Sequence, residues 1–183
     1  MSWLTDAKIP VGQTAKAAVD WLIANGGWFF DGLSDALEVL IAAALWALQT
    51  PPPLAVIAAF VALSYWLRRS VATSALVALG LLFIVNQGYW RETTETLTLV
   101  LSAVVVCMGL GVPIGIAAAH RPRLYAALRP VLDLMQTLPT FVYLIPAIVF
   151  FGIGMVPGLL ATAVFVLPAP IRLTHLGVSA TPR

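Results

Sequence analysis

A long uncharged stretch decides the fold of this chain: Leu134–Ile171 reads LMQTLPTFVYLIPAIVFFGIGMVPGLLATAVFVLPAPI. Its 38 residues predict two membrane spans joined by a turn at 152–158, since one spanning helix needs only about 20 residues. Prolines, which lack a backbone donor, lie within the two predicted spans, outside the turn, at positions 139, 146, 168 and 170. Backbone groups in hydrocarbon must be satisfied inside the protein, so we expect broken helices of the kind found in transporters and channels.

The composition also indicates a membrane protein. Hydrophobic residues make up 61% and charged residues 10% of the 183 residues, whereas soluble domains are about 25% charged. Five or six spans of about 20 residues fit this length and leave no room for a large extramembrane domain. The net charge is only +2 and no basic cluster is present, so we exclude a nucleic-acid partner.

The first 50 residues predict helices at the membrane surface. A short helix is expected around Gln13–Asn25, ended by the glycine pair at 26–27, and a second helix is expected to begin at an Asp35 cap and end at the prolines at 51–53. Its uncharged part, Val39–Leu48, is too short to span. A helix lying in the interface is favoured over a tilted span, and both interpretations stay open.

The rest of the chain predicts membrane spans separated by short loops. These are Pro53–Leu67, Ser70–Trp90, Leu97–Ala119, Leu134–Gly152 and Met155–Ile171. Arginines gather in alternate loops, at 68–69, at 121–129 and from 172 onward. Because arginine-rich loops stay in the cytoplasm, the N-terminus is predicted to lie outside.

No catalytic or metal-binding constellation is visible in the sequence. His120 and His175 flank predicted membrane ends, and Cys107 is the lone cysteine in an apolar run. No ionisable residue lies within a predicted span, which argues against a proton-coupled carrier. We therefore predict a protein that is not an enzyme and carries no cofactor or metal of its own.

Two features predict sites within the membrane. Gly111 and Gly115 are four residues apart, a spacing that lets two helices approach closely. Gln136, Thr137, Phe141 and Tyr143 surround Pro139 where a helix would meet the membrane, and they are our candidates for lining a transport pathway. The alternative is that Gln136 and Thr137 only satisfy carbonyls that Pro139 leaves free.

Several segments together resemble one family of transport proteins. They are Thr96–Leu99, Gly111–Gly115, Arg129–Pro146, Phe151–Gly158 and Pro168–Gly177. They look like the permease subunit of ABC importers for glycine betaine, proline betaine and choline. The resemblance is strong from Glu92 to Arg183 and covers half of the chain.

This resemblance implies an all-α polytopic membrane protein with the N-terminal part of a type I ABC importer permease fold. Residues 1–50 would form an external segment, 51–91 two accessory spans and 92–183 a partial permease core of three spans. The chain would end before the family's cytoplasmic coupling helix, as a truncated permease would.

The resemblance also implies a function and partners. The protein would be the inner-membrane permease of an importer for quaternary ammonium osmolytes. ATP would be hydrolysed on a separate ABC ATPase subunit, a periplasmic binding protein would deliver the substrate, and a second permease copy would complete the pathway. The alternatives are a non-transporting membrane scaffold fragment and a stand-alone channel or secondary carrier.

Overall fold

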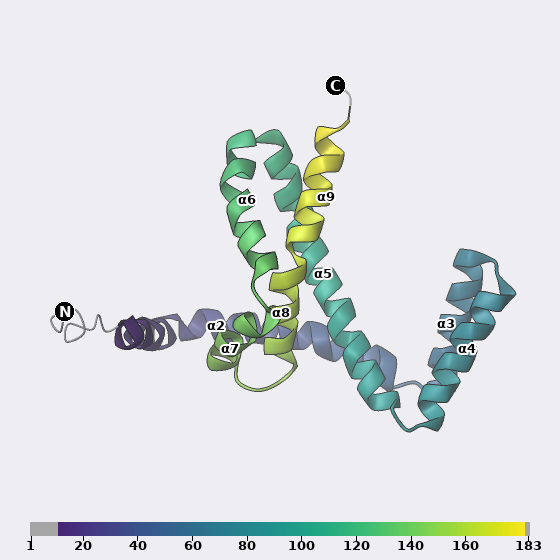
Figure 1. Ribbon diagram of the computed structural model, residues 1–183. Helices are drawn as coiled ribbons and strands as arrows, with labels where there is room; N and C mark the ends of the chain where they lie inside the picture. Colours follow the sequence, from purple (N-terminus) through teal and green to yellow (C-terminus); the bar gives the residue numbers. More distant parts are fainter. Residues whose placement is uncertain (1–10, 182–183) are drawn as a thin grey trace, which may run out of the picture.

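The computed structural model describes residues 11–181, and in this range the chain forms helices without strands (Figure 1). The predicted all-α, polytopic class is confirmed. The helices are α2 (Val11–Gln49), α3 (Pro53–Arg68), α4 (Val71–Asn86), α5 (Trp90–His120), α6 (Pro122–Thr137), α7 (Thr140–Phe151), α8 (Met155–Val166) and α9 (Pro168–Ser179).

Helix α2 is one continuous element of 39 residues. The predicted break at Gly26 and Gly27 is therefore wrong, and Asp35 lies inside the helix rather than capping it. A glycine inside a helix costs only about 1 kcal/mol, and packing further along outweighs that cost. Leu37 and Ile41 are buried in a core cluster with residues of α5 and α8.

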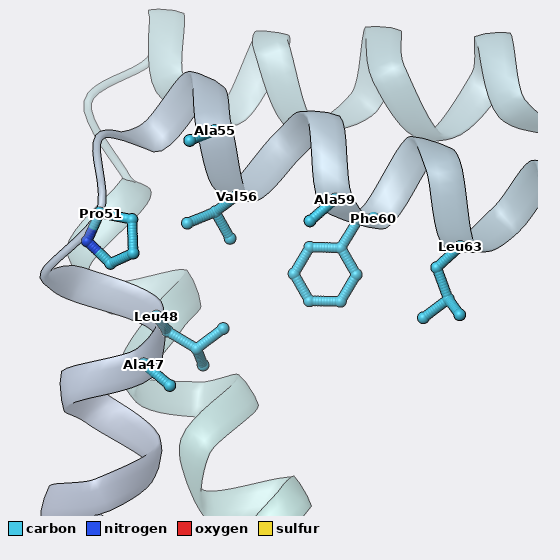
Figure 2. Close-up of a pocket in the computed structure, with 8 residues that line it drawn as sticks. All are labelled: Ala47, Leu48, Pro51, Ala55, Val56, Ala59, Phe60 and Leu63. Carbon is cyan, nitrogen blue, oxygen red and sulfur yellow. The ribbon is translucent and has the colours of Figure 1, made fainter.

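The proline run after α2 ends that helix as predicted and turns the chain by 97° into α3. An apolar cavity of about 420 Å³ lies inside this elbow (Figure 2). Its lining residues come from both helices and the linker: Ala47, Leu48, Pro51, Ala55, Val56, Ala59, Phe60 and Leu63.

Helices α3 and α4 form a hairpin that stands away from the centre of the molecule (Figure 1). Arg69 ends α3 in the left-handed conformation, with φ of 48°. Ser70 then caps α4 by accepting a hydrogen bond from the Thr73 amide. Each helix has 16 residues, slightly fewer than the roughly 17 that span a bilayer without distortion.

Helix α5 forms the centre of the fold, and it contacts α2, α8 and α9. Its buried face consists of small residues, which lets the neighbouring helices lie close. That face carries Thr94, Thr98, Ser102, Ala103, Cys107, Gly111, Gly115 and Ala118.

Within residues 11–181, two continuous stretches are long and apolar enough to cross a membrane, and the count rises to four if each bent pair forms one span. These two are Trp90–His120 with 31 residues and Met155–Ser179 with 25 residues. The helical stretch from Met155 thus continues beyond Ile171, the end of the predicted span. The turn before it is also tighter than predicted, because α8 already begins at Met155.

The predicted span Leu134–Gly152 is not a single helix, in line with the break expected at its prolines. The chain instead bends by 95° between α6 and α7. Leu138 is extended, with φ of −81° and ψ of 139°, because a residue before proline disfavours the helical conformation. Pro139 then sets the start of α7.

Candidate functional site

The α6–α7 bend carries the four residues predicted to line a pathway. The carbonyl of Leu134 is its anchor point: the Thr137 hydroxyl donates to it at 3.1 Å and the Tyr143 hydroxyl at 3.2 Å. The side chain of Tyr143 thereby reaches back from α7 to α6. The bend is held by side-chain hydrogen bonds as well as by Pro139.

The structure spreads these four residues over the bend. Gln136, Thr137 and Phe141 are exposed, with 73% of Phe141 accessible. Tyr143 is half-buried and lines a cavity of about 320 Å³ bounded by α2, α7 and α8. The Thr137 hydroxyl donates to the carbonyl of Leu134. The carbonyl that loses its helical donor because of Pro139 is a different one, that of Met135.

An aromatic cluster closes the same cavity against α2. The ring of Phe30 stacks on Phe150, with centroids 4.6 Å apart, and meets Phe151 edge-on at 5.7 Å. Such pairs contribute about 0.5–1.5 kcal/mol beyond burial. The cluster attaches the N-terminal helix to the helix that follows the bend.

Gly111 and Gly115 lie where α5 meets α9. A Cβ atom on Gly111 would be 2.8 Å from Cγ of Pro170. A Cβ on Gly115 would be 2.7 Å from the carbonyl oxygen of Ile171 and 2.7 Å from Cβ of Thr174. No side chain fits at either distance, so the two backbones approach this closely only with glycine.

A row of buried hydroxyls on α5 was not predicted from the sequence. Thr94 accepts a hydrogen bond of 2.9 Å from the Gln49 side chain of α2. The hydroxyl oxygens of Thr98 and Ser102 are buried and have no hydrogen-bond partner within the described part of the chain. The spacing of four residues between these polar residues was the signal that could have revealed one helix face.

An ion pair between α6 and α9 was not predicted from the sequence either. Arg172 donates from Nη2 to Oδ1 of Asp133 at 2.5 Å, which joins α9 to α6. Arg172 lies just past the predicted span Met155–Ile171 but inside the same helical stretch. The candidate span continues to Ser179 and includes Arg172, which is costly in hydrocarbon unless a partner compensates its charge.

A second contact joins the start of α6 to the last part of α9. The ring of Tyr125 stacks on His175, with centroids 3.6 Å apart and planes 6° apart. Helices α6 and α9 are thus joined at two levels, by a ring stack and by an ion pair. The ion pair lies nearer the α6–α7 bend, because Asp133 comes a few residues before that bend in the chain.

Comparison with known proteins agrees with this arrangement. Residues 111–182 match the model of the family described as binding-protein-dependent transport system inner membrane component. This segment of the chain is therefore a domain of that permease family. The match begins at Gly111 and so includes the α5–α9 contact and the α6–α7 bend.

Three relatives resemble nearly the whole chain. The chain is 40% identical over 96% of its length to the glycine betaine transport system permease protein OpuAB of Bacillus subtilis. It is 39% identical over 93% to the glycine betaine/carnitine transport permease protein GbuB of Listeria monocytogenes. It is 37% identical over 95% to the glycine betaine/proline betaine transport system permease protein ProW of Escherichia coli.

These relatives are longer than the chain, which spans 62%, 61% and 49% of their respective lengths. Each is named as a transport permease, and none is named as an enzyme. The resemblance seen in the sequence motifs is confirmed, and it extends further toward the N-terminus than Glu92.

Proposed function

We propose that this protein is the membrane permease of an ATP-driven importer for glycine betaine or a related quaternary ammonium osmolyte. The observation that carries the proposal is the 37–40% identity over nearly the whole chain to permeases named for glycine betaine. The broken α6–α7 element and the long α5 and α8–α9 helices supply the frame of a transmembrane path.

The proposed partners follow from the same family. An ABC ATPase subunit hydrolyses ATP, a periplasmic binding protein delivers the osmolyte, and a second permease copy forms the other half of the path. The protein lies in the inner membrane with its N-terminus outside, in agreement with the arginine distribution. Gln136, Thr137, Phe141 and Tyr143 line the path, and the aromatic rings suit a quaternary ammonium group.

Reconstitution tests the proposal. The purified chain is placed in vesicles with the ATPase and binding protein of its own organism, and uptake of labelled glycine betaine is measured with and without ATP. Uptake that requires ATP and the binding protein supports the importer. Uptake without either component would identify a channel or secondary carrier, and no uptake would leave the scaffold alternative.

A further inference from the structure

The ion pair between Asp133 and Arg172 joins segments that are 39 residues apart in the chain. Side-chain exposure is 35% for Arg172 and 52% for Asp133, so the pair is neither fully solvated nor sealed. Nε of Arg172 is buried and has no hydrogen-bond partner among the described residues. The guanidinium is therefore held against the protein, and Asp133 is the acceptor that fixes its direction.

The position of Asp133 connects this pair to the bend. Asp133 lies one residue before Leu134, whose carbonyl accepts hydrogen bonds from Thr137 and Tyr143. The last turn of α6 and the first turn of α7 thus form one hydrogen-bonded unit. Within it, the Asp133 carboxylate is the group bonded to α9.

We propose that Asp133 and Arg172 are positioning residues that hold the α6–α7 bend at a set place on α9. A movement of α9 is then transmitted through the pair to the bend and to Gln136 and Thr137, which directly follow it. A role of this ion pair in transport rests on the proposed function. The structural connection between α9 and the bend does not.

Labelling of single cysteines tests the link without any transport. In a Cys107→Ser background, Gln136→Cys reports on the bend and Ala126→Cys on the other end of α6, and both positions are exposed. The rate of reaction with a water-soluble maleimide is measured in detergent micelles. Arg172→Gln and Asp133→Asn should each change the rate at 136 about fivefold, the factor that corresponds to about 1 kcal/mol, and leave the rate at 126 unchanged.

Two further variants separate positioning from general damage. The charge exchange, Asp133→Arg with Arg172→Asp, should restore the original rate at 136. The neutral pair, Asp133→Asn with Arg172→Gln, leaves no unpaired charge, so it should fold and still show the altered rate. Glu95→Gln is the matched control, because it breaks the exposed Arg91–Glu95 ion pair of 2.8 Å on α5.

The outcomes are distinct. An unchanged rate at 136 in the neutral pair, or an equal change at 126, would overturn the proposal. Uptake is then measured for the same variants in the reconstituted system. If the unaltered chain does not transport, the proposed function fails, while the labelling pattern still decides the role of the ion pair.

Discussion

Gly115 is the residue whose substitution the structure forbids most clearly. An added Cβ would lie 2.7 Å from the backbone oxygen of Ile171, which cannot move aside as a flexible side chain would. We expect Gly115→Ala to lower the free energy of unfolding by about 1–3 kcal/mol, the usual cost of overpacking. Unfolding of the purified protein in detergent measures it. Gly109→Ala on the same helix is the control, since nothing lies within 4 Å of its Cβ position, and equal stability of both variants would contradict the expectation.

The hydroxyl of Tyr143 gives a second prediction at this scale. Tyr143→Phe keeps the ring that lines the cavity and removes the hydrogen bond to the Leu134 carbonyl. We expect a loss of about 1 kcal/mol of stability, the net value of one such bond. The control is Tyr65→Phe on the exposed side of α3. A larger loss at position 65 than at 143 would show that the bend does not depend on this bond.

The structural role of a single residue could be predicted from the sequence where it depends on neighbouring residues in the chain. The spacing of Gly111 and Gly115 indicated a close helix contact, and Pro139 indicated a break. The partner of each residue was not predictable, because it depends on which helices become neighbours. Both Asp133 and Arg172 lie just outside the predicted spans, and their pairing became visible only once α6 was seen to include Asp133 and α9 to continue past Arg172.

Continuity of α2 is the most informative feature among the elements. Gly26 and Gly27 lie in its interior, and a Cβ on Gly27 would meet only Asp31 Oδ2, at 4.0 Å. We expect Gly27→Ala to raise stability by about 0.5–1 kcal/mol, because alanine loses less backbone entropy in a helix. Gly26→Ala should gain less, since its Cβ would lie 3.0 Å from the Phe30 ring. Circular dichroism during thermal unfolding measures both, and a loss of helicity in Gly27→Ala would contradict a continuous helix.

Element boundaries followed from the sequence wherever proline sets them. The prolines after Gln49 end α2, and Pro53 begins α3. The boundaries drawn at the Gly26–Gly27 pair and just before Arg172 differ from the helix ends, because packing overrode both signals. Helix α2 continues through its glycines while burying Leu37 and Ile41, and α9 continues through Arg172, whose charge meets Asp133.

Across the whole molecule, the helices divide into a packed centre and an arm. Helices α5, α8 and α9 form the centre, and α2 crosses them and leads to the α3–α4 hairpin (Figure 1). The core cluster of Leu37, Ile41, Ala103, Val156 and Leu159 lies where α2 meets α5 and α8. The arm is joined to this centre through the elbow at 50–52 and the α4–α5 connection.

The distribution of arginines predicts how this arrangement sits in the membrane. The α5–α6 connection, with Arg121 and Arg123, and the end of α9 lie on the same side of the molecule (Figure 1). Arginine-rich loops stay in the cytoplasm, so this side should face inward. In a Cys107→Ser background, a membrane-impermeant maleimide should label Lys16→Cys in intact cells and Ala126→Cys only after permeabilisation. Both positions are exposed, so a position that stays unlabelled is shielded by the membrane. The reverse labelling pattern would show that the N-terminus lies inside.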